Sequence, residues 1–173
     1  TSMERPGNEA DKDRLMVVNL ANGEKTYVTR DFDYNAANIR WNDENTLTFI
    51  SPIAATHQIC TATLDGQIKV LTNGDHDYTW FDRKGEMMVA GRNTISQAAE
   101  LYSVNTQSGE SVQLSFINKQ IYDNVKMGEV QKRWVKTTDG KQMLVWVILP
   151  PNFDATKKYP TLLYCEGGPQ SVV

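Results

Sequence analysis

Short apolar runs recur through the first 120 residues at a constant distance from turn glycines. Gly23, Gly66 and Gly109 are spaced 43 residues apart, and the phrase that ends at Gly23 returns almost unchanged at Gly109. An apolar run precedes each glycine and a second short run follows it. An apolar run, a glycine turn and another run predict a β-hairpin in each repeat.

Two further pairs of strand-like runs lie between these hairpins. Residues 39–41 and 46–50 form one pair around the polar residues 42–45, and residues 78–81 and 87–90 form the other. Thr, Val and Tyr at alternate positions favour strands over pairs of helices. Four strands in each repeat of about 43 residues predict the blades of a β-propeller.

The predicted blades do not complete a propeller. Up to residue 124 there is room for roughly two and a half blades, whereas closed propellers have about four to eight. An open sheet exposes unpaired strand edges, which proteins generally avoid. We therefore expect the chain to belong to a larger protein, or to form a homo-oligomer through these edges.

The pattern changes after residue 124. Residues 130–138 and 141–149 predict two strands joined by a turn at Asp139-Gly140. A polar link leads to residues 161–165, a continuous apolar run of the kind that forms a strand buried on both faces. Glu166, Gly167, Gly168 and Pro169 follow this run.

Composition narrows the class of protein. Hydrophobic residues make up 40% and charged residues 23% of the chain, as in ordinary globular proteins. The net charge of −3 without a long basic run argues against a nucleic-acid partner. The longest apolar stretch, residues 143–149, is too short to span a membrane. Cys60 and Cys165 lack the spacing of a metal site and are expected to be buried thiols.

Three sequence phrases near the end resemble one peptidase family. Residues 148–154 (ILPPNFD), residues 157–160 (KKYP) and Gly167-Gly168-Pro169 are similar to the prolyl oligopeptidase family of serine peptidases, especially its dipeptidyl peptidase IV branch. In that family a β-propeller precedes and partly covers an α/β-hydrolase domain. The resemblance therefore implies a mainly β chain, with the last propeller blades at residues 1–125 and the first hydrolase strands at residues 126–173.

The resemblance assigns residues 166–168 to an oxyanion loop. In α/β-hydrolases the loop after the third strand supplies backbone N–H groups to the developing negative charge, and glycines allow the close approach. Glu166 departs from the family, which has Tyr or His at this position. An ionised carboxylate has no donor, so we expect Glu166 to point elsewhere or to bind a substrate amine.

No catalytic triad is recognisable in the sequence. It contains no Gly-x-Ser-x-Gly elbow, and its two histidines lie in polar stretches where surface or turn roles are expected. Residues 75–77 predict a turn rather than a metal site, and residues 43 and 44 a solvated hairpin tip. The remaining aromatic candidates are assigned to the blade core rather than to a binding platform: Trp41, Trp80 and Phe81.

The resemblance implies a serine exopeptidase that releases N-terminal dipeptides, while the propeller restricts access of the peptide substrates. It implies a Ser, His and Asp triad beyond Val173, no cofactor and no metal, so this chain by itself is expected to be inactive. Two alternatives stay open: a non-enzymatic propeller with a decayed hydrolase tail, and an acylaminoacyl-peptidase or oligopeptidase relative. A sequence continuing into a Gly-x-Ser-x-Gly elbow would favour an enzyme. The compartment stays open, and our working expectation is a bacterial extracytoplasmic location.

Overall fold

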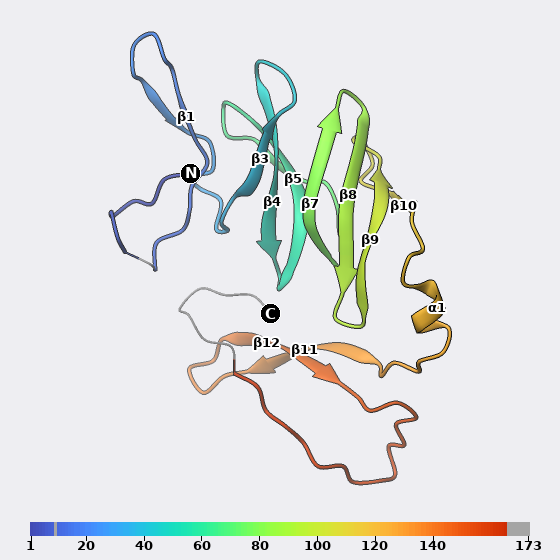
Figure 1. The fold of residues 1–173 in the computed structure, drawn as a ribbon. Helices are drawn as coiled ribbons and strands as arrows, with labels where there is room; N and C mark the ends of the chain where they lie inside the picture. Colours follow the sequence, from blue (N-terminus) through green and yellow to red (C-terminus); the bar gives the residue numbers. More distant parts are fainter. Residues whose placement is uncertain (9, 166–173) are drawn as a thin grey trace.

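A computed structural model describes residues 1–8 and 10–165, which contain twelve strands and one short helix (Figure 1). The strands that precede the helix are β1 (Met16–Val18), β2 (Lys25–Tyr27), β3 (Ala37–Trp41), β4 (Thr46–Ile53), β5 (Thr56–Thr63), β6 (Ile68–Val70), β7 (Asp77–Lys84), β8 (Met87–Thr94), β9 (Gln97–Val104) and β10 (Ser111–Gln113). The helix α1 (Lys119–Tyr122) and the strands β11 (Val130–Lys136) and β12 (Gln142–Ile148) follow.

Two complete blades form the centre of the chain. Strands β3 to β6 form one four-stranded antiparallel sheet and β7 to β10 form another, with neighbours in the sheet also neighbours in the sequence. The two sheets stand side by side, and the β1–β2 hairpin lies beyond the first of them (Figure 1). The predicted propeller-like architecture is confirmed.

The repeated glycines occupy the turns that the sequence predicts. Gly23, Gly66 and Gly109 have φ values of +74°, +89° and +76° in the β1–β2, β5–β6 and β9–β10 turns. A Cβ atom on Gly66 would lie 3.4 Å from the carbonyl oxygen of Val28, and one on Gly109 only 1.9 Å from that of Leu71. Each of these two turns therefore contacts the residue that follows the second strand of the preceding hairpin, Val28 after β2 and Leu71 after β6.

Apolar side chains from alternate strand positions form two clusters. One joins the two blades, and the other fills the space between the first blade and the β1–β2 hairpin. Cys60 is fully buried in the second cluster, as predicted. The first cluster contains Ile50, Ile59, Leu71, Tyr78, Phe81, Met88, Ala90 and Val104.

The assignment of three aromatic residues to the blade core is correct for only one of them. Phe81 is buried at 3% exposure, whereas Trp41 and Trp80 are 53% and 42% exposed. Neighbouring residues of a strand face opposite sides of the sheet, so Trp80 turns away from the cluster that Phe81 enters. Trp41 is the last residue of the edge strand β3.

The strand predicted at residues 161–165 is absent from the structure. These residues have no regular secondary structure, and Leu162, Leu163 and Tyr164 are 98%, 85% and 77% exposed. Cys165 is exposed too, which corrects its assignment as a buried thiol. A doubly buried strand needs a ladder partner on each side, and no described strand pairs with this segment.

The remaining elements agree with the sequence more closely. Strands β11 and β12 pair in register from Val130 opposite Ile148 to Lys136 opposite Gln142. Residues 43 and 44 lie in the turn between β3 and β4, as predicted. No helix among the described residues is long and apolar enough to cross a membrane.

Candidate functional site: the seam between the blades and the β11–β12 hairpin

The predicted oxyanion-loop residues Glu166, Gly167 and Gly168 lie outside the described residues. The structure does describe the seam where the β11–β12 hairpin crosses one end of the blades (Figure 1). This is the end that carries the β4–β5 and β8–β9 turns.

A cavity of about 230 Å³ lies in this seam. Its walls come from both blades and from the hairpin, so it exists only where the three parts meet. The lining residues are Ala55, Thr56, Asp75, Asp77, residues 94–96, Val130 and Trp146.

An ion pair joins the hairpin to the blades at the edge of the cavity. The Nζ atom of Lys132 lies 2.7 Å from Oδ1 of Asp75 and 4.9 Å from the ring centroid of Trp146. Lys132 and Trp146 are directly opposite each other in the β11–β12 ladder. The indole N–H of Trp146 is buried and has no hydrogen-bond partner among the described residues.

The second cavity carboxylate, Asp77, is bonded within the blades. Its Oδ1 atom accepts the backbone N–H of His57 at 2.6 Å and lies 3.0 Å from Nδ1 of the same residue. Burial works to raise the pKa of Asp77, but the hydrogen bonds and charge of His57 hold it below its ordinary value.

His76 has the predicted turn position, in the bend before β7, where it is partly buried beside Tyr78 with ring centroids 5.1 Å apart. His57 lies within β5 rather than in a turn, but its side chain is 42% exposed, which agrees with the predicted surface role. Burial and the charge of Arg92 lower the pKa of His76. In the described part of the chain no serine hydroxyl is hydrogen-bonded to either histidine, so the His57–Asp77 pair has no nucleophile beside it.

The two carboxylates of residues 75–77 have separate partners. Lys132 and His57 pair with the carboxylates of Asp75 and Asp77 respectively. Residues 1–8 and 10–165 contain no group of three or more His, Cys, Asp or Glu side chains arranged to hold a metal ion.

A second cavity, also about 230 Å³, lies between the last blade and α1. Its buried carboxylate, Glu100, accepts hydrogen bonds from the hydroxyl of Ser115 and from both the backbone N–H and side-chain amide of Asn118. These bonds hold the pKa of Glu100 below its ordinary value. Ser115 and Asn118 lie after β10, and Glu100 belongs to β9, so these hydrogen bonds hold the segment after β10 against β9.

The seam contact was missed by the sequence reasoning, although one local signal was present. Val130, Lys132 and Trp134 share one face of β11, which places a lysine between two apolar side chains. A lysine in such a position either extends its ammonium into water or meets a partner in the folded protein. Its partner, Asp75, is far away in sequence and no local pattern identifies it.

Comparisons with known proteins place the chain among peptidases. No family model matches it. Dipeptidyl-peptidase 5 of Porphyromonas gingivalis is 43% identical over 174 residues, covering 99% of this chain and 25% of that protein. Dipeptidyl-peptidase 5 of Porphyromonas endodontalis is 39% identical over 126 residues, covering 72% of this chain and 18% of that protein. The chain thus spans about a quarter of the length of the first of these relatives and less of the second.

Solved structures share the fold at lower identity. The acylaminoacyl peptidase of Pyrococcus horikoshii has a TM-score of 0.69 at 23% identity, covering 86% of this chain and 22% of that chain. The AtxE2 isopeptidase, solved as a variant with Astexin3-dC4 bound, has a TM-score of 0.72 at 18% identity, covering 92% of this chain and 25% of its own. With these folds and the dipeptidyl-peptidase 5 relatives taken together, the chain belongs to the prolyl oligopeptidase family of serine peptidases.

Proposed function

We propose that this chain is part of a serine exopeptidase that releases dipeptides from the N-termini of peptides. The observation that carries the proposal is the 43% identity to a dipeptidyl-peptidase 5 across 99% of the chain. The catalytic Ser, His and Asp then belong to parts of the protein outside these 173 residues. No cofactor is required for this chemistry.

The described geometry is consistent with the propeller restricting access to the peptidase half. The blades end before α1, and β11–β12 forms a separate two-stranded sheet after it. This change of architecture supports residues 1–125 as propeller blades and residues 126–173 as the start of the α/β-hydrolase domain. The seam cavity lies at the boundary between them.

The decisive experiment compares the full-length protein with residues 1–173 alone. The full-length protein should release dipeptides from dipeptidyl chromogenic substrates, and residues 1–173 should show no turnover and no labelling by a fluorophosphonate. Blocking the substrate's N-terminus with an acetyl group should abolish turnover. Cleavage of N-acetylated substrates instead would favour an acylaminoacyl peptidase, and an unreactive full-length protein would refute the peptidase proposal.

The oxyanion loop is a further part of the proposal. We assign oxyanion stabilisation to the backbone N–H groups of Glu166, Gly167 and Gly168, because an ionised Glu166 side chain cannot donate a hydrogen bond. Loss of an oxyanion donor costs about 100- to 1000-fold in turnover. Glu166→Gln leaves the backbone donors in place and should lower kcat less than about tenfold. A loss within the donor range, with unchanged KM and an intact fold, would contradict the assignment, whereas a rise in KM alone would indicate an amine-binding role for Glu166.

Self-association through strand edges is also a proposal. The strands β3, β6, β7 and β10 are at the edges of the two four-stranded sheets in the described residues. Unpaired edges favour pairing with another chain. Light scattering of the full-length protein at several concentrations tests this, and a monomer at all of them would refute it.

A further inference from the structure

The second cavity, between the last blade and α1, contains a guanidinium without an ionic partner. Four charged side chains line this cavity: Arg92, Glu100, Lys119 and Asp123. Lys119 and Asp123 pair with each other at 2.6 Å, and the oxygens of Glu100 accept hydrogen bonds from the segment after β10. Glu100 lies opposite Arg92 in the β8–β9 ladder, yet no carboxylate of the described residues forms an ion pair with Arg92.

The guanidinium of Arg92 is held in a fixed orientation. Its central carbon lies 3.7 Å from the ring centroid of Tyr102, and Nη1 donates to the hydroxyl of Ser111 at 2.8 Å. The Tyr102 hydroxyl donates in turn to Oε1 of Gln113 at 3.2 Å, which fixes the ring beneath the guanidinium. Within the described residues the bond to Ser111 is the only hydrogen bond of the Arg92 side chain, so its other N–H groups are oriented but unpaired. Such a planar set of donors matches a carboxylate.

Two further polar groups of the cavity are incompletely bonded. Oδ1 of Asn93 is buried and accepts no hydrogen bond from the described part of the chain. The Tyr122 hydroxyl on α1 accepts the backbone N–H of Ala98 at 2.6 Å, but no acceptor among the described residues takes its own proton. Both side chains line the cavity together with Arg92. The cavity therefore has unpaired donors on the blade and on α1, and one unpaired acceptor between β8 and β9.

The size and chemistry of the cavity define a class of ligand. Pockets for drug-sized molecules usually have about 300–1,000 Å³, so a cavity of about 230 Å³ suits a smaller molecule. We propose that the second cavity binds a small carboxylate that carries an adjacent amide N–H, which is the chemistry of the C-terminal residue of a short peptide. Arg92 and Tyr122 donate to the carboxylate, and Asn93 accepts from the N–H. This inference goes beyond the proposed function because it requires no catalytic group, although release of dipeptides would produce molecules of this class.

The test measures binding of N-acetylglycine to the full-length protein by ligand-observed NMR titration. Treatment with a fluorophosphonate first blocks the catalytic serine, so that binding at the catalytic site does not contribute. N-acetylglycine has both the carboxylate and the amide N–H, and it should bind with a Kd of about 10 mM or tighter. N-acetylglycinamide lacks the carboxylate and acetate lacks the N–H, so each should bind at least about tenfold more weakly.

Three variants connect this binding to the cavity. Arg92→Gln should weaken binding of N-acetylglycine at least about tenfold, because it removes charge-assisted donors. Asn93→Ala should weaken binding of N-acetylglycine and leave that of acetate unchanged. Arg40→Gln, at an exposed position of the first blade outside the cavity lining, is the matched control and should change neither. If Arg92→Gln prevents folding, Arg92→Lys replaces it, because lysine keeps the charge but not the planar pair of donors, and it should weaken binding too.

Hydrogen exchange of residues 119–124 provides a second readout. A ligand bound between Arg92 and Tyr122 should slow exchange in α1 of the wild-type protein and not in Arg92→Gln. No saturable binding by about 10 mM, equal binding of N-acetylglycinamide or acetate, or binding that the Arg92 variants leave unchanged would overturn the inference. A protein that binds N-acetylglycine in this way but does not cleave dipeptidyl substrates would refute the proposed function and support the inference.

Discussion

Replacing Gly109 by alanine should destabilise the last blade more than the same change at any open turn. The alanine Cβ would lie 1.9 Å from the carbonyl oxygen of Leu71, ~1.5 Å short of an ordinary contact. Leu71 is itself 6% exposed, and its N–H is bonded to the carbonyl of Ile59 at 2.9 Å, so it cannot retreat freely. The turn and the preceding blade must therefore move apart.

The magnitude follows from two costs. An alanine at φ +76° costs about 1 kcal/mol in backbone strain. Forcing extra volume into a packed contact costs about 1–3 kcal/mol more. We expect a total of about 2–4 kcal/mol for Gly109→Ala and a smaller loss for Gly66→Ala, whose Cβ would meet a carbonyl at 3.4 Å. Gly85→Ala, with φ +61° and no atom within 4 Å, should cost only the backbone strain of about 1 kcal/mol.

Hydrogen exchange of β9 and β10 in the full-length protein measures these differences locally. A loss of 2–4 kcal/mol speeds exchange by roughly 30-fold or more. Gly85→Ala is the matched control because it shares the positive φ without the close contact. If Gly109→Ala speeds exchange no more than Gly85→Ala, the contact with Leu71 does not constrain the turn, and the reasoning fails.

Two further predictions concern buried side chains. Gln58→Met should lower the free energy of unfolding by about 2–3 kcal/mol, because it removes the buried donor to the carbonyl oxygens of Gly74 and His76. Hydrogen exchange of β5 measures this loss, and Gln97→Met, at an exposed position, should change that exchange little. Burial raises the pKa of Cys60 to about 12, so iodoacetamide at pH 8 should alkylate Cys165 in the folded protein and Cys60 only after unfolding, as read by mass spectrometry. The Cys60 thiol ionises at lower pH in the unfolded protein than in the folded one, so the stability that Cys60 contributes should be lost as the pH rises above about 8.5. Alkylation of Cys60 before unfolding would refute its burial.

The blades could be predicted from the sequence because their signals are local. A turn with positive φ favours glycine, so Gly23, Gly66 and Gly109 mark the repeat in the sequence itself. Successive strand residues face opposite sides of the sheet, so only one of Trp80 and Phe81 can point into the core. The packing of one sheet against the other decides which of the two it is. The assignment of both to the core ignored this alternation.

The seam could not be predicted in the same way because its contacts are distant in sequence. Asp75 was assigned to a polar turn, which is correct locally but does not indicate the lysine of β11 that it meets. His57 lies in a polar stretch and still forms part of β5, because Asp77 satisfies its ring and its backbone N–H. Such pairings depend on how the blades and hairpin pack, and hydropathy patterns do not contain that information.

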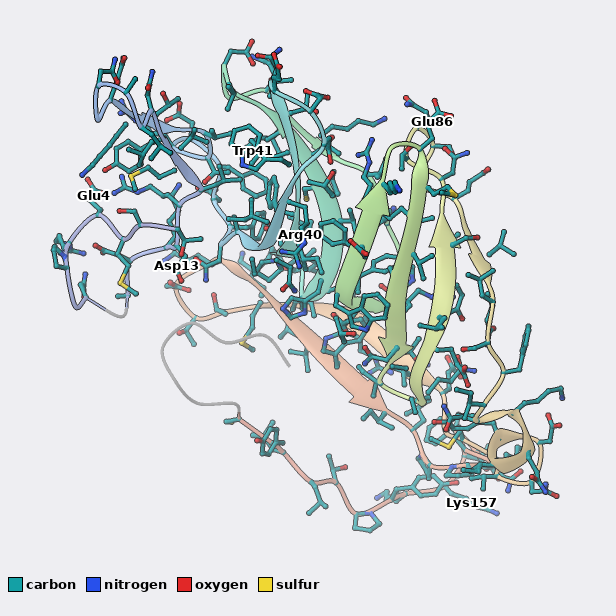
Figure 2. All side chains as sticks on the ribbon, turned by 45° about the horizontal axis from the view of Figure 1, so that its top comes forward. Glu4, Asp13, Arg40, Trp41, Glu86 and Lys157 are labelled. Atoms are coloured by element: carbon teal, nitrogen blue, oxygen red, sulfur yellow. The ribbon has the colours of Figure 1, made fainter. Side chains whose placement is uncertain are left out.

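Two turns at the same end of the second blade should differ in how they accept changes of chain length. At the β7–β8 tip, where Glu86 projects away from the hairpin, a Cβ on the neighbouring Gly85 meets nothing within 4 Å (Figure 2). At the β9–β10 turn, Gly109 is already pressed against Leu71. Exposed tips tolerate inserted residues, whereas a turn in contact with another blade does not. Peptide tags or fluorescent labels are therefore best introduced beside Glu86, and natural insertions in related chains are expected in the β7–β8 turn.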